Sequence, residues 1–130
     1  MRMSNEEYAA FVDSLSPRSP IWGDLLRAGL VGGAICTVGQ VLVNLYEHWG
    51  ASATVAATWC SITLVFLGAL LTGLGVYDRI GRTAGAGSIV PITGFANSVC
   101  SPALEFKTEG WIYGLAAKMF VVAGPIIVYG

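Results

Sequence analysis

Charged residues in this chain are separated by long uncharged stretches. A bilayer core of about 30 Å is crossed by about 20 residues of helix. The apolar stretches at about Leu25–Tyr46, at Thr54–Tyr77 and at 110–130 are long enough, so each predicts a spanning helix. Lys118 is the single charge of the last stretch, and at mid-depth it needs a polar neighbour or water. The pattern predicts an all-α polytopic membrane protein with three spanning helices.

A further uncharged stretch, residues 83–104, differs in composition from an ordinary lipid-facing helix. It holds three Gly, two Pro, three Ser, two Thr and Asn97. Pro91 removes a backbone N–H, and the glycines lower helix propensity. We therefore expect a broken helix or a re-entrant segment here. Broken backbone at membrane depth is tolerated only where protein buries it or a water-filled cavity wets it, so this segment is the candidate solute pathway.

The N-terminal residues predict an amphipathic helix over residues 4–15. Ser4-x-x-Glu7 is a capping box. An apolar stripe with helical spacing follows, made of Tyr8, Phe11, Val12 and Leu15. The opposite face is acidic, which disfavours anionic lipid and favours a protein partner or the rim of the membrane domain. We divide the chain into an N-terminal amphipathic helix and linker (1–20) and a transmembrane domain (21–130). The acidic start lacks the apolar run of a cleavable signal peptide.

Composition narrows the possible functions. The chain has 130 residues, of which 55% are apolar and 12% charged, against about 25% charged in soluble domains. Its net charge of −1 gives no basic surface for nucleic acid. The three cysteines lack metal-ligand spacing, and scattered carboxylates do not supply the several oxygens that calcium requires. The sequence therefore indicates no nucleic-acid partner, no metal site and no cofactor.

Enzymatic interpretations lack a complete set of residues. Asp78 followed by Gly85-x-Gly87 resembles part of an intramembrane aspartyl protease site, which needs two carboxylates. Ser88 stands where the second carboxylate should be. Ser88 and Lys118 could act as nucleophile and base, but no Gly-x-Ser-x-Gly motif surrounds Ser88. We do not expect an enzyme.

For several polar and small residues, the sequence allows two interpretations. Gln40 and Asn44, four residues apart, either hydrogen-bond another helix or line a pathway. Asp78 and Arg79 form either a solvated turn or the mouth of the pathway. Gly29-x-x-x-Gly33 predicts close helix packing, or it reflects chance in a chain with 17 glycines.

The distribution of arginine and lysine predicts the orientation in the membrane. By the positive-inside rule, the N-terminus and the loop at 78–82 face the cytosol. If residues 83–104 cross the membrane, the C-terminus is cytosolic as well. If they re-enter, the C-terminus lies outside.

Three runs of residues carry a resemblance to a known family. They are LGVYDRIG at 74–81, AGAGSIVPITGFANS at 84–98 and ALEFKTEG at 103–110, and VGGAIC at 31–36 adds to them. Together they closely resemble the AC family of the stage V sporulation (SpoVA) membrane proteins. The sister AE family shares the glycine-rich run, and the assignment to AC rests on residues 105–107 and on the N-terminal extension.

The resemblance implies a membrane subunit of a channel in spore-forming bacteria. That channel carries dipicolinic acid, with calcium, across the inner (forespore) membrane during sporulation and germination. The implied partners are the AE membrane subunit and the soluble AD subunit, in a homo- or hetero-oligomer within the lipid bilayer. Members of the family continue through a further apolar stretch, so a truncated last helix stays open for this chain.

The chemistry of a planar aromatic dianion suits the broken segment. Half-helix N-termini direct N–H groups and positive dipole ends at anions. The candidate pathway residues are Gly85, Gly87, Ser88, Pro91, Thr93, Gly94, Asn97 and Ser98, with Gln40 from the first spanning helix and Lys118 from the last. The candidate mouth is formed by Asp78, Arg79 and Arg82.

Two alternatives for function follow from the same sequence. One is a less selective, tension-gated solute channel, which flux of unrelated osmolytes would favour. The other is a non-conducting scaffold subunit that docks partners through the helix at 4–15 and the glycine-containing helix faces. A scaffold would tolerate substitution of Asn97 or Lys118, whereas a channel would change its flux.

Overall fold

The computed structural model describes residues 4–15 and 20–129, which form helices and no strand. The predicted linker lies mostly outside these residues, at 16–19. The elements are α1 (Asn5–Leu15), α2 (Ile21–His48), α3 (Ala53–Gly73), α4 (Tyr77–Ala84), α5 (Ala86–Ile89), α6 (Ile92–Glu105), the 3-10 turn η1 (Lys107–Glu109), the π-helical turn η2 (Trp111–Ala116) and α7 (Ala117–Tyr129).

The predicted N-terminal helix and its capping box are both confirmed. α1 begins at Asn5, directly after Ser4. The backbone N–H of Ser4 donates to Oε2 of Glu7 at 2.9 Å, and the N–H of Glu7 donates to Oγ of Ser4 at 3.2 Å. Two N–H groups that a helix start leaves without a partner are thereby satisfied.

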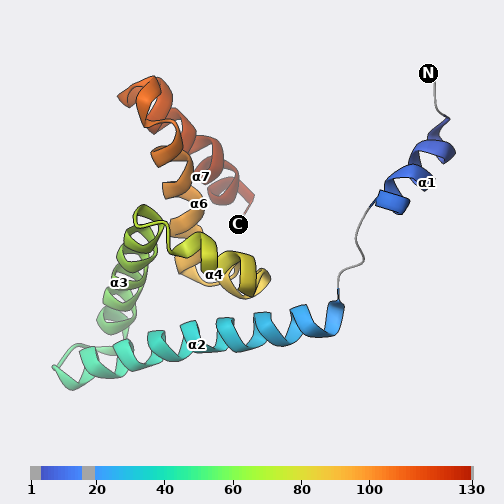
Figure 1. Ribbon diagram of the computed structural model, residues 1–130. Helices are drawn as coiled ribbons and strands as arrows, with labels where there is room; N and C mark the ends of the chain where they lie inside the picture. Colours follow the sequence, from blue (N-terminus) through green and yellow to red (C-terminus); the bar gives the residue numbers. More distant parts are fainter. Residues whose placement is uncertain (1–3, 16–19, 130) are drawn as a thin grey trace.

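The three predicted spanning helices are also confirmed. α2, α3 and the continuous helix Trp111–Tyr129 have 28, 21 and 19 residues and are apolar enough to cross a membrane. Figure 1 shows α2 crossing the other helices at a steep angle, and none of its residues is buried. The fold is that of an all-α polytopic membrane protein, in which most apolar side chains of α2 are not covered by other helices of the chain.

The second spanning helix ends earlier than the sequence predicted. α3 stops at Gly73, because Gly75 adopts a left-handed φ of +68° that side-chain-bearing residues rarely adopt. The N–H of Val76 then donates to the carbonyl of Leu71 at 2.9 Å, which closes the helix end. Tyr77 is therefore not the end of a spanning helix but the first residue of α4.

The glycine- and proline-rich segment is broken, as predicted. The first break is at Gly85, whose φ of +51° separates α4 from α5. The second is at Pro91, whose extended ψ of 158° separates α5 from α6. With 14 residues, α6 is about 21 Å long, which is shorter than a bilayer core of about 30 Å.

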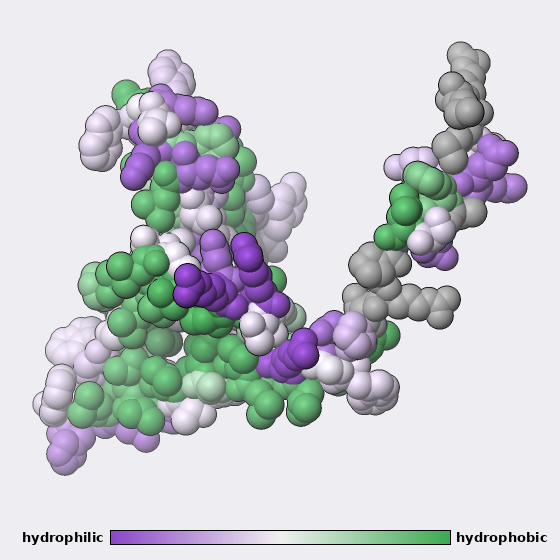
Figure 2. Space-filling model, in the orientation of Figure 1, coloured by the Kyte–Doolittle hydropathy of each residue, from purple (hydrophilic) through white to green (hydrophobic). Residues whose placement is uncertain are grey.

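The interior consists of small and polar residues, whereas large apolar side chains face outward. The buried residues other than glycine are Ala56, Cys60, Thr72, Tyr77, Ala84, Ser88, Thr93, Ala96 and Ala103. Ile62 and Phe66 of α3 remain 62% and 63% exposed. Figure 2 shows this apolar exterior, with a hydrophilic patch over α4. Small residues inside and large apolar residues outside are typical of helices that pack within lipid.

Glycines bring the broken segment into backbone contact with its neighbours. A Cβ at Gly87 would overlap the carbonyl oxygen of Ala28 in α2, and a Cβ at Gly94 would overlap that of Ser88. Gly32 faces Gly87, whereas a Cβ built at Gly29 or Gly33 would meet no atom of the described residues within 4 Å beyond its own helix turn. Within this chain, the close approach predicted for Gly29-x-x-x-Gly33 is therefore made one position away, at Gly32.

Replacing Gly94 by alanine should destabilise the fold by about 1–3 kcal/mol, because the new methyl group meets rigid backbone of α5. Denaturant unfolding of the purified protein in detergent measures this loss. Gly73→Ala is the matched control, since no atom lies within 4 Å of its Cβ position. Equal stability of the two variants would contradict the packing described for Gly94.

Candidate functional site

The broken segment is held together by one buried tyrosine. The hydroxyl of Tyr77 forms 2.8 Å hydrogen bonds with the backbone carbonyl of Ser88 and with Oγ1 of Thr93. Ser88, Tyr77 and Thr93 are only 1%, 3% and 6% exposed. Since the break removes regular helical partners, the tyrosine links the end of α5 to the start of α6 and satisfies polar groups that lipid could not.

A second hydrogen bond ties α6 to the spanning helix α3. Oγ1 of Thr72 bonds the carbonyl of Gly68 at 2.6 Å and Oδ1 of Asn97 at 2.9 Å. The single hydroxyl proton of Thr72 is shared between these two acceptors, and the NH2 group of Asn97 forms no hydrogen bond with another described residue. Gly68 allows this approach, because a Cβ there would lie 2.9 Å from the carbonyl oxygen of Thr93.

Predicted pathway residues line one pocket of about 530 Å³ between α4 and α6, which we call the α4–α6 pocket. It is lined by Tyr77, Asp78, Gly81, Arg82, Ser88, Ile89, Gly94, Asn97 and Ser98. Four of the predicted pathway residues and two of the predicted mouth residues therefore share one cavity. Its polar groups are hydroxyls, an amide, one carboxylate and one guanidinium, a set suited to hydrogen-bonding a small polar solute.

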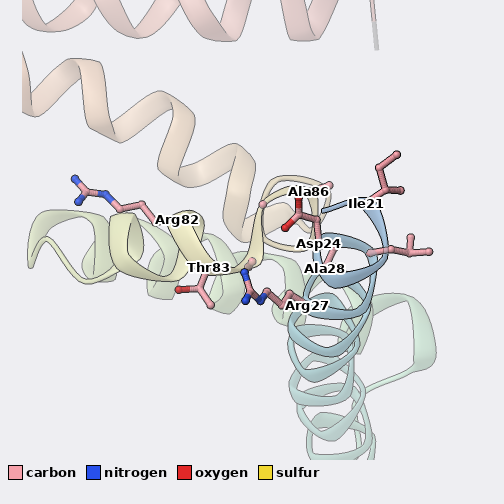
Figure 3. A pocket seen from close by; sticks show the side chains of 10 residues that line it. Ile21, Asp24, Arg27, Ala28, Arg82, Thr83 and Ala86 are labelled. Carbon is pink, nitrogen blue, oxygen red and sulfur yellow. The ribbon is translucent and has the colours of Figure 1, made fainter. Parts of the chain in front are cut away.

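A neighbouring pocket of about 550 Å³ lies at the Gly85 break, between α2 and α4. Figure 3 shows Asp24 and Arg27 of α2 facing this break, whereas the side chain of Arg82 extends away from α2. Arg82 lines both this α2–α4 pocket and the α4–α6 pocket. The two cavities thus meet at one cationic residue.

The arginines around these pockets have no carboxylate partner within the described chain. Neither Asp24 nor Asp78 forms an ion pair with Arg27, Arg79 or Arg82 among residues 4–15 and 20–129. Around the α2–α4 pocket, two arginines oppose one aspartate, so its formal charge is positive. An anion approaching α4 therefore meets guanidinium groups that no internal carboxylate binds.

The remaining predicted residues of the broken segment are structural neighbours of the pocket. Gly85 lies in the α2–α4 pocket at the break itself. Gly87 and Pro91 line a shallow cavity against α2, and Thr93 is buried beneath Tyr77. α5 is only one turn long, so it supplies little of the aligned peptide dipole that we expected near Gly85–Ser88.

Three predicted residues lie apart from the α4–α6 pocket. Arg79 lines an apolar groove on the other side of α4. Gln40 is exposed on α2, and its Nε2 donates to Oδ1 of Asn44 at 2.9 Å, so the two amides satisfy one another. Nζ of Lys118 lies 4.2 Å from the ring centroid of Phe106. The neighbour of Lys118 is thus an aromatic ring, in a cation–π contact.

Sequence reasoning missed Tyr77, Asp24 and Arg27. Tyr77 looked like the end of a spanning helix, and only the α3–α4 turn directs its hydroxyl inward. Asp24 and Arg27 lie more than 50 residues from Gly85 in sequence, and they reach the break only because Gly87 packs on α2. The glycines at 85 and 87 were the available signal of such a close approach.

No group of three or more His, Cys, Asp or Glu side chains that could hold a metal ion occurs within the described ranges 4–15 and 20–129.

Comparison with protein families shows to which family the chain is related. A model of the family described as "SpoVAC/SpoVAEB sporulation membrane protein" matches residues 24–130. The chain belongs to this family. No solved structure matches it.

A curated member of the SpoVAC/SpoVAEB family supports the AC assignment. The chain is 48% identical over 126 residues to stage V sporulation protein AC of Bacillus subtilis (strain 168). The match covers 96% of this chain and 84% of that protein. The resemblance inferred from the glycine-rich run is therefore confirmed.

Substituting Tyr77 by phenylalanine should lower the unfolding midpoint in detergent by about 5 °C, because two buried polar groups lose their partner. Tyr113→Phe is the control, since that ring is 83% exposed. An unchanged midpoint in Tyr77→Phe would show that the tyrosine does not hold the break.

Proposed function

We propose that this chain is a membrane subunit of the channel that moves dipicolinic acid, with calcium, across the inner membrane of the spore during sporulation and germination. Membership of a family of sporulation membrane proteins supports the setting. Three helices long and apolar enough to span a bilayer support an integral membrane location. We assign no residue to calcium.

The observation that carries the proposal is the polar α4–α6 pocket within an otherwise apolar chain. Dipicolinate is a planar aromatic dianion, so leaving water requires hydrogen-bond donors and positive charge in exchange. Arg82 offers a guanidinium and Asn97 an amide NH2 group at this pocket. Several modest contacts of this kind favour passage over trapping.

Hydroxyl groups supply further, adaptable contacts. Oγ of the half-buried Ser98 donates to the carbonyl of Phe95 at 2.8 Å, whereas Oγ of Ser88, which is only 1% exposed, stays bonded to the carbonyl of Gly85 at 2.9 Å. A hydroxyl can rotate its proton toward a passing carboxylate and return it to the backbone afterwards. Such exchange keeps each site weak, as conduction requires.

The cationic entrance that we propose differs in part from the sequence prediction. Arg27 faces the Gly85 break, and Arg82 lines the same pocket from α4 with its side chain directed away from α2 (Figure 3); both are free of internal ion pairs among the described residues. A cavity bearing excess positive charge raises the local concentration of an anionic solute. Arg79 faces a different cavity and is assigned no part in solute entry.

A complete pore requires further chains in this proposal. α2 has no buried residue, and its apolar surface is open. We therefore propose assembly with the AE membrane subunit and with the soluble AD subunit, as a hetero-oligomer in the inner spore membrane. The additional helices would enclose the polar face of α4.

Replacing Arg82 by glutamine should lower dipicolinate flux by about tenfold, because the shared cation of both pockets is lost. The measurement is release of dipicolinate from liposomes carrying this chain with the AE subunit, followed by terbium luminescence. Lys107→Gln removes one exposed cation outside the two pockets and should leave the flux unchanged.

Three results would count against this proposal. Parent liposomes without dipicolinate flux would contradict a channel. Equal release of several unrelated osmolytes would favour a tension-gated, less selective channel. Unaltered flux in both Arg82→Gln and Asn97→Leu would mean that the α4–α6 pocket is not on the route.

A further inference from the structure

A third cavity, of about 700 Å³, opens on the opposite side of α4 from the α4–α6 pocket. We call it the α2–α3 groove, because side chains of these two helices form most of its wall. Leu64, Leu67 and Leu71 line it from α3, and Leu30 and Ile35 line it from α2. The wall carries one charged side chain, that of Arg79. The groove is thus an apolar slot with a single cation.

The position of the groove along α3 matches one leaflet of a bilayer. α3 has 21 residues and is about 31 Å long, which is close to the thickness of the hydrocarbon core. Leu71 lies near its end and Leu64 near its middle, so the lining extends about 10 Å along the helix. With α3 spanning the bilayer, the slot would descend from the membrane surface toward the centre.

The cation lies at the surface end of this slot. Arg79 follows the end of α3 by six residues, in the first turn of α4. It is exposed and forms no ion pair with another described residue. A guanidinium binds phosphate through two parallel hydrogen bonds and is weakly hydrated, so it suits the headgroup level.

A phospholipid is complementary to this lining, because its anionic phosphate lies at the membrane surface and its apolar chains lie below. We propose that the α2–α3 groove binds one acyl chain of an anionic glycerophospholipid, whose phosphate is held by Arg79. The order of the groove's lining supports this occupant, because a lipid places its anionic phosphate beside Arg79 and its acyl chain along the leucines below. The proposal is independent of the solute that the chain transports.

The bound lipid would touch the residues that hold the helix break. Tyr77 and Thr93 line the α2–α3 groove, and Tyr77 also lines the α4–α6 pocket. An acyl chain in the groove therefore supports one side of the tyrosine whose other side faces the polar pocket. Loss of the lipid would remove that support from Tyr77.

Native mass spectrometry of the full chain in detergent, with added phosphatidylglycerol or phosphatidylcholine of identical acyl chains, tests the proposal. The parent should retain phosphatidylglycerol preferentially. Arg79→Gln should reduce that preference about fivefold, because a surface cation beside an anionic headgroup is lost. Arg82→Gln removes a guanidinium outside the groove and should keep the preference.

A second pair of variants tests the apolar part of the slot. Leu67→Trp should fill the groove and reduce retention of both lipids, whereas Phe66→Trp, on the exposed face of the same helix, should not. Equal lipid retention by the parent and Arg79→Gln would overturn the proposal. A dimer mass that Leu67→Trp abolishes would also overturn it, since the occupant would then be a second copy of the chain.

Discussion

A helix that breaks inside a membrane leaves backbone carbonyls and N–H groups that lipid cannot satisfy. In this chain the hydroxyl of Tyr77 meets that constraint by bonding the carbonyl of Ser88 and the hydroxyl of Thr93 in the buried interior. The rest of the broken segment depends on this contact, because it joins α4, α5 and α6 into one unit. Gly85 and Pro91 therefore interrupt the helix while the carbonyl of Ser88 keeps a hydrogen-bond partner.

Close packing around the break determines where the polar groups lie. Gly87 places α5 directly on α2, and Gly68 places α6 on α3, so small residues occupy the interior and large ones face lipid. α4 is left at the surface of this unit, with its arginines unpaired among the described residues. One side of α4 then borders polar pockets and the other an apolar groove. A single short helix thus separates a polar pocket from an apolar groove.

Gaps between charges were enough to predict the three spanning helices, because length and apolar composition alone control membrane insertion. The breaks near Gly85 and Pro91 also followed from local chemistry. The end of α3 did not, since the apolar run continues to Val76 and only the left-handed turn at Gly75 stops the helix. Contacts between residues far apart in the sequence could not be predicted either. Arg27 reaches the break only through the packing of α2, and no local sequence pattern indicates this contact.

For the proposed function, the α4–α6 pocket must contain water although it lies within a membrane protein. Labelling of single cysteines by a membrane-impermeant thiol reagent in proteoliposomes tests it directly, after alanine replaces the three native cysteines. Ser98→Cys, in the pocket, should be labelled rapidly, and Phe66→Cys, on the apolar face of α3, should resist the reagent. Equal protection of both positions would contradict a water-filled pocket, because the broken segment would then be sealed from water.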